Sequence, residues 1–87
     1  MSQQRFACPC CGYYTLDEEP PGTFAICPVC VWEDDSVQFQ DHDYVSGANK
    51  VSLTQAQQNF QKFGASEERL LAIARPPQPD EMLPSVM

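Results

Sequence analysis

The sequence is short of basic residues, and it has none at all between Arg5 and Lys50. Five Lys and Arg residues stand against 12 Asp and Glu residues, which gives a formal net charge of −7. The acidic side chains within the stretch that lacks basic residues are Asp17, Glu18, Glu19, Glu33, Asp34, Asp35, Asp41 and Asp43. A surface of this sign repels phosphate backbones, so the composition argues against nucleic-acid binding.

The sequence also lacks apolar runs long enough for a membrane span, so we expect a soluble protein that does not associate with membranes. No apolar signal stretch precedes the first cysteines, and the cysteine count of five is odd. Both features argue against a secreted disulfide framework, and we expect reduced cysteines in the cytoplasm. A chain this short buries only about 60% of the surface that its unfolded form exposes, so it usually needs a disulfide, a metal or a partner.

Four of the cysteines form two Cys-x-x-Cys pairs, in Cys8-Pro9-Cys10-Cys11 and Cys27-Pro28-Val29-Cys30, with 15 residues between the pairs. Each pair can form a tight turn, here called a knuckle, that presents two sulfurs on one side. The intervening residues suffice for a hairpin that brings the second knuckle opposite the first. This spacing predicts that Cys8, Cys11, Cys27 and Cys30 bind one structural Zn²⁺, because four thiolates leave no open coordination position. Iron is the main alternative, since paired knuckles also hold a single iron.

Two further residues are candidates for chemistry. Cys10 is left over in the first knuckle, and we interpret it as a spare thiol, with a redox or ligand-exchange role as the alternative. His42 lies within the acidic segment, residues 33–43. Together with the nearby carboxylates it is a candidate for a second metal site or a hydrolytic centre. These carboxylates are Asp34, Asp35, Asp41 and Asp43. A single loop histidine is more often simply solvated, and we find no catalytic constellation, so we do not expect an enzyme.

The residue pattern indicates a small α+β fold. Tyr13–Leu16 and Thr23–Ile26 favour strands, and the breaker-rich residues 17–22 between them predict a hairpin loop. Val31-Trp32 is a candidate third strand in which Trp32 belongs to the core, and residues 33–44 are compatible with a loop or an edge strand. The fold class is therefore a zinc-ribbon-like β-hairpin with two knuckles, followed by two short helices.

The helices are predicted from their caps and apolar spacing. Ser52 and Gln55 have the form of a capping box, so a helix should begin at Leu53 and end before a left-handed cap at Gly64. Its apolar face comprises Leu53, Ala56, Phe60 and Phe63. A second helix is expected over residues 66–75, ended by Pro76-Pro77. We predict one domain, residues 1–75, followed by a Pro-rich, flexible tail, residues 76–87.

Several motifs occur together in a recognisable order. They are Cys8-Pro9-Cys10-Cys11-Gly12-Tyr13, Leu16-Asp17-Glu18, Cys27-Pro28-Val29-Cys30 with Trp32-Glu33-Asp34-Asp35, and residues 47–53 with Ala56, Asn59 and Phe60. Over roughly residues 6–64 the chain resembles the bacterial cysteine-rich CPCC family. The resemblance implies a small bacterial protein of zinc-ribbon-like fold, and it implies no particular activity.

The leading functional hypothesis is a zinc-stabilised protein-interaction module whose acidic loop face, residues 33–43, binds a basic protein partner. One concrete form is a small antitoxin or immunity-type protein that masks a basic, nucleic-acid-directed partner. The alternative is a thiol redox sensor or a metal-dependent hydrolase that uses Cys10, or His42 with the nearby carboxylates.

Overall fold

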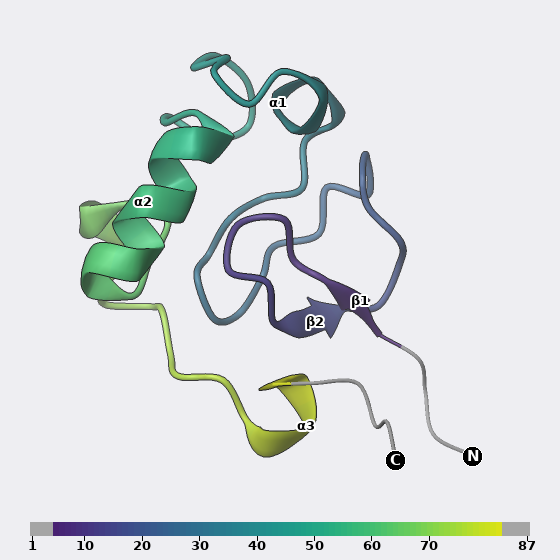
Figure 1. The fold of residues 1–87 in the computed structure, drawn as a ribbon, viewed down its shortest axis with the longest axis vertical. Helices are drawn as coiled ribbons and strands as arrows, with labels where there is room; N and C mark the ends of the chain where they lie inside the picture. The colour runs from purple at the N-terminus through teal and green to yellow at the C-terminus, as the bar shows by residue number, and fades with distance from the viewer. Residues whose placement is uncertain (1–4, 83–87) are drawn as a thin grey trace.

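The computed structural model describes residues 5–82 and shows a small α+β protein. A two-stranded antiparallel sheet precedes three α-helices and one turn of 3-10 helix (Figure 1). The elements are β1 (Phe6–Ala7), β2 (Tyr14–Leu16), α1 (Ser36–Gln40), α2 (Leu53–Phe63), η1 (Glu68–Leu70) and α3 (Pro79–Met82). Helices α1 and α3 lie at opposite ends of the long axis, and α2 runs alongside the segments between them (Figure 1).

The sheet is a hairpin closed by the first knuckle. The strand predicted at Tyr13–Leu16 is confirmed as β2, but the prediction of Thr23–Ile26 as its partner is wrong, because β2 pairs with β1. The knuckle reverses the chain, since the amide of Cys8 donates to the carbonyl of Tyr13 at 2.9 Å. Two residues N-terminal to the knuckle are thereby placed beside β2, and a partner so close in sequence costs little loop-closure entropy.

Residues 23–27 pair instead with the segment that follows the second knuckle. Ile26 forms an isolated antiparallel bridge with Glu33, and the amides of Cys27 and Asp34 donate to the carbonyls of Trp32 and Ala25 at 2.9 Å each. Each knuckle therefore lies at the tip of its own short antiparallel pair. The prediction that Trp32 belongs to the core is confirmed, since only 1% of its surface is exposed.

The helix predicted to begin at Leu53 is confirmed as α2, with both caps. The hydroxyl of Ser52 accepts from the amide of Gln55, and Gly64 has φ 94° at the C-terminus. The side chain of Gln55 bonds to Asn59 rather than back to the cap. The ring of Tyr13 meets that of Phe60 edge-on at 6.0 Å, which joins the hairpin to α2.

The segment before α2 contains a helix that periodicity did not indicate. Residues 33–44 are predicted as a loop or an edge strand, yet α1 begins after Asp35, whose carboxylate accepts from the amides of Val37 and Gln38. In α1 the polar side chain of Gln38 is buried while Val37 is exposed. Because the buried residue is polar and the exposed one is apolar, the spacing of apolar residues does not predict this helix.

The C-terminal part is less helical than predicted. The helix expected over residues 66–75 is reduced to η1 and adjoining turns, because backbone groups in this stretch bond to the second knuckle. The amide of Ser66 donates to the carbonyl of Cys30, and that of Arg75 donates to the carbonyl of Val29. Residues 76–82, assigned by sequence to the tail, include α3, which contacts β2 and buries Glu81 against Arg75. Residues 83–87 lie outside the described range.

The core surrounds the knuckles. It combines cysteine side chains with Leu16, Val29, Trp32, Leu53 and Ala56, and Phe6, Tyr13 and Phe60 pack against it. Among residues 5–82, no helix is both long enough and apolar enough to cross a bilayer.

Candidate metal centre

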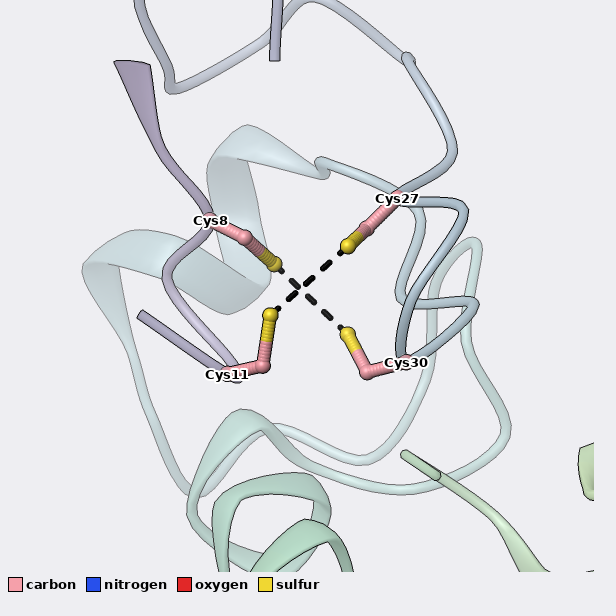
Figure 2. Close-up of side chains that lie close together, drawn as sticks. All are labelled: Cys8, Cys11, Cys27 and Cys30. Atoms are coloured by element: carbon pink, nitrogen blue, oxygen red, sulfur yellow. Dashed lines mark hydrogen bonds between the residues drawn. The ribbon is translucent and has the colours of Figure 1, made fainter. Parts of the chain in front are cut away.

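Four cysteine sulfurs converge at one point in the core. Figure 2 shows the side chains of Cys8, Cys11, Cys27 and Cys30 pointing toward a common centre, two from each knuckle. The four Sγ atoms all lie within 4.8 Å of one another. The two contacts across the centre join Cys8 to Cys30 at 3.6 Å and Cys11 to Cys27 at 3.7 Å. None of these cysteines is in a disulfide. The residues predicted as ligands from spacing are thus brought together as a group that could hold a metal ion.

The two knuckles have the same backbone hydrogen bonding. In the first, the amide of Gly12 donates to the carbonyl of Cys8, and in the second, the amide of Val31 donates to the carbonyl of Cys27, both at 2.8 Å. Gly12 and Val31 follow the last cysteine of each knuckle and have φ 82° and 70°. Val31 therefore takes a backbone conformation that is normally adopted by glycine. The second knuckle thus makes the same turn as the first, although it has no glycine at this position.

The dimensions of the cluster suit a tetrahedral thiolate site. A Zn–S bond of about 2.3 Å with tetrahedral angles places the sulfurs about 3.8 Å apart. Two of the six sulfur separations, 3.6 and 3.7 Å, are close to this value, and all six lie within 4.8 Å. Cys8, Cys27 and Cys30 are buried, and Cys11 is half-buried, so the site is enclosed. A divalent ion held here would link the two knuckles and leave no position for substrate.

The protonation of the four thiols is unequal. The pKa of Cys27 is lowered, because its sulfur accepts hydrogen bonds from Cys11 above all, and also from Cys30 and Cys8. Hydrogen bonding to Cys11, Cys27 and Cys10, respectively, raises the pKa values of Cys8, Cys11 and Cys30. A bound divalent cation would require all four cysteines to bind as thiolates, so metal binding would release protons.

Thr15 is an additional residue of the site that the spacing of the cysteines did not reveal. Its hydroxyl donates to Cys27 Sγ at 3.0 Å. Phe6 pairs with Leu16 and Ala7 with Tyr14, so Thr15 is the extra residue of a β-bulge in β2. Bulges redirect side chains, and this one turns Thr15 toward the cluster. A hydrogen bond of this kind orients a ligand sulfur and reduces its basicity.

Cys10 is close to the cluster but does not belong to the group of four. It is 7% exposed and lies in the hydrophobic core. Cys10 is thus left over from the group of four, as the interpretation of a spare thiol has it, but its side chain is buried rather than exposed. Reagents in solution react mainly with accessible thiolates, so burial disfavours rapid chemistry at Cys10.

The acidic residues around His42 do not form a second site. Within residues 5–82, the four cysteines are the only group in which three or more potential ligand atoms converge. His42 is exposed and meets Phe39 edge-on, with ring centroids 6.2 Å apart. Asp34 is wholly buried, and its Oδ2 accepts from the amide and hydroxyl of Thr23. The carboxylate of Asp35 caps α1 and also accepts from the amide of Ala48.

A buried amide network holds the segment after the second knuckle in place. The side chain of Asn49 accepts from the amide of Glu33 at 2.9 Å and donates to its carbonyl at 2.8 Å, as a neighbouring strand would. It also donates to Gln38 Oε1 at 2.9 Å. The Gln38 side chain in turn donates to the carbonyls of Tyr44 and Val51. These contacts join the backbone at Glu33 to Asn49 and to Gln38 of α1.

The chain is similar in sequence to a known protein family. The sequence profile described as Cysteine-rich CPCC matches residues 6–81, which is most of the chain. This range includes both knuckles, the amide network and α3 up to Glu81. The chain matches no curated protein.

Proposed function

The chain belongs to the cysteine-rich CPCC family, and we propose that it is a small, zinc-stabilised interaction module that binds a basic protein partner through its acidic face. In this proposal Cys8, Cys11, Cys27 and Cys30 hold one structural Zn²⁺ in a zinc-ribbon-like fold. The role is non-catalytic, and the setting is the reducing cytoplasm of a bacterium.

The closed cluster of four sulfurs is the observation that carries the zinc assignment. Soft thiolate ligands suit zinc, and the sulfur separations of 3.6 and 3.7 Å match a tetrahedral shell. The core of so small a chain contributes little stability alone. Structural zinc supplies an apparent binding free energy of about 10–16 kcal/mol in small domains, and most of it becomes folding free energy.

Metal analysis with native mass spectrometry tests this assignment directly. We expect one zinc per chain, and loss of folded circular-dichroism signal when a chelator removes it. Cys27→Ala and Cys11→Ala should each abolish zinc binding and the folded signal, because a three-sulfur shell no longer links the knuckles. Cys10→Ala is the matched control, and it should keep one zinc. Iron in the purified protein, or equal damage from Cys10→Ala and Cys11→Ala, would contradict the assignment.

The distribution of charge supports the interaction role. No basic residue lies between Arg5 and Lys50, and the exposed carboxylates in this stretch are Asp17, Glu18, Glu19, Asp41 and Asp43. Asp34 and Asp35 lie at the centre of the acidic segment, but their carboxylates bond to backbone groups of the protein itself. Reversing their charge would therefore unfold the segment rather than test docking. The docking carboxylates in this proposal are the five exposed ones and half-buried Glu33.

A partner of the proposed kind is a protein with a basic, nucleic-acid-directed surface that this chain masks, as an antitoxin or immunity protein does. Native mass spectrometry of the untagged protein from its natural source should show a basic chain bound to the zinc-loaded form. The bound fraction should fall as salt increases, and Asp41→Asn with Asp43→Asn should weaken binding without loss of zinc. Gln58→Ala, on the exposed side of α2, serves as the surface control.

The alternative, a thiol sensor or hydrolase, has less support. Cys10 is 7% exposed, and the carboxylates nearest His42 in sequence are not assembled around it. Alkylation of the zinc-loaded protein separates the two proposals: a sensor requires one rapidly modified cysteine, whereas the interaction module predicts slow modification of all five.

A further inference from the structure

The paired segments 24–27 and 32–34 have an inner and an outer face. Their inner face carries Cys27, Trp32 and Asp34, all buried. Ile26 and Glu33, the bridged pair between these buried positions, point the other way, and Ile26 is 58% exposed. Phe24, two positions before Ile26, is 65% exposed. Two large, exposed apolar side chains therefore lie two positions apart in the chain.

Phe24 is held in its exposed position at a conformational cost. Its φ is 60°, in the left-handed region that side chains other than glycine, asparagine and aspartate rarely adopt. Strain of this kind usually has a local benefit such as burial or a hydrogen bond made by the side chain. An aromatic ring that is mostly exposed gains little from burial, so packing of the ring does not account for this conformation. The conformation does present the ring to the outside.

The buried carboxylate of Asp34 makes this presentation rigid. Asp34 Oδ2 accepts from the amide and the hydroxyl of Thr23 at 2.9 and 2.8 Å, and the Thr23 hydroxyl accepts from the amide of Ala25. The amide of Phe24 itself donates to the carbonyl of Asp34 at 3.0 Å. The backbone on both sides of Phe24 is thus anchored to one buried residue, and little ordering entropy remains to be lost when the ring is covered.

The charge around Phe24 and Ile26 indicates which class of partner can bind there. The hydrogen bonds that flank the bridge make Ile26 and Glu33 a non-hydrogen-bonded pair, the type in which opposing side chains lie closest together. A carboxylate therefore stands directly beside the exposed Ile26 side chain. Residues 17–19, all acidic and exposed, lie on the loop that leads to Phe24. Phosphate backbones, anionic membranes and a second copy of this chain, at a formal charge of −7, are all repelled.

We propose that Phe24 and Ile26 are the apolar anchor of the docking face, and that they bind a cationic protein segment whose apolar side chains are flanked by Lys or Arg. This inference rests on the proposed interaction role and adds the contact point and the chemistry of the partner. The carboxylates steer and orient the segment, while the ring of Phe24 supplies contact area.

Fluorescence anisotropy with two synthetic peptides tests the anchor. One peptide alternates leucine and lysine, and the other alternates serine and lysine at the same charge. The zinc-loaded protein at physiological salt should bind the leucine peptide at least 10-fold more tightly. Phe24→Asn, which suits a positive φ, and Ile26→Ser should each remove most of this preference, a loss of about 10- to 100-fold for a buried aromatic ring.

Val45→Asn is the matched control, because Val45 is 64% exposed and lies outside the paired segments. It should change affinity by less than twofold, and zinc content with circular dichroism should show all variants folded. Equal binding of both peptides, unaffected by Phe24→Asn but weakened by Asp41→Asn with Asp43→Asn, would overturn the anchor and leave the acidic interaction role standing. Binding of neither peptide would count against both.

Discussion

Replacing Asn49 with alanine should destabilise the protein strongly, although Asn49 is not a cysteine and makes no contact with the metal centre. The change removes three hydrogen bonds: two to the backbone of Glu33 and one to Gln38 Oε1. The amide and carbonyl of Glu33 then lose their partners in a largely enclosed position, since Asn49 is only 5% exposed. Each unpaired buried group costs about 1–3 kcal/mol, so we expect a loss of about 3 kcal/mol in the free energy of unfolding.

Urea denaturation at neutral pH, followed by circular dichroism, measures this loss. The free zinc concentration is buffered to the same value for every variant, because ligand binding adds its own contribution to apparent stability. With a slope of about 1–3 kcal/mol per molar urea, the midpoint should fall by about 1–3 M. Gln58→Ala, on the exposed side of α2, is the control and should stay within about 0.5 kcal/mol.

Asn49→Asp makes the test sharper at constant side-chain size. The aspartate can still accept from the amide of Glu33, but its second oxygen faces the carbonyl of Glu33 and Gln38 Oε1, which are both acceptors. We expect it to lose at least as much stability as Asn49→Ala at neutral pH. A loss below about 1 kcal/mol for the alanine variant, or a wild-type midpoint for the aspartate variant, would refute the view that this amide network holds the fold together.

Three other predictions follow from single contacts. Gly47→Ala should lower the free energy of unfolding, measured by urea denaturation, by about 1–3 kcal/mol, because Gly47 has φ 140° and a Cβ there would lie 3.0 Å from Asp35 Oδ2. Gly12→Ala is the comparison: a Cβ at Gly12 meets nothing within 4 Å, so this variant should lose only the stability that its strained φ takes away. Thr15→Val should weaken zinc binding about 10- to 100-fold in a chelator competition, while Thr15→Ser keeps the hydroxyl and should stay near wild type; equal affinities for all three proteins would show that the bond to Cys27 has no influence. Hydrogen bonding from Arg75 lowers the pKa of Glu81, so the ionised carboxylate stabilises the fold above the unfolded pKa of about 4.5, and this contribution is lost as pH falls through the lower, folded value. The stability difference between wild type and Glu81→Gln should therefore be constant from neutral pH to about pH 5 and shrink below it, and a difference that grows on acidification would contradict the ion pair.

The sequence-based predictions succeed where the signal is local. The Cys-x-x-Cys spacing identifies the four sulfurs that converge, because each knuckle places its own two sulfurs together. Ser52 and Gly64 identify the ends of α2, because capping depends on the few residues next to the helix terminus. The strand Tyr14–Leu16 is likewise indicated by its own β-prone residues.

Pairing between segments is where the predictions fail. Thr23–Ile26 has the composition of a strand, but composition does not say which segment it will pair with, and the structure pairs it with residues 32–34. The helix α1 is concealed because its buried residue is Gln38, whose burial is favourable only when Asn49, Tyr44 and Val51 supply partners. Thr15 becomes part of the metal centre only through a bulge in the register of β1 and β2.

The sequence by itself determined which four cysteines converge, the principal helix and the absence of basic residues from the stretch between Arg5 and Lys50. Each of these depends on residue identity and short-range spacing. Only the tertiary structure decided which carboxylates are exposed, since Asp34 and Asp35 are bonded to distant backbone groups while Asp41 and Asp43 remain exposed. It also decided that Phe24 and Ile26, two apolar residues, are both exposed. Whether a side chain is buried and hydrogen-bonded depends on which segments the fold brings together. Residues of the same type, such as these aspartates, can therefore be bonded within the protein at one position and exposed at another.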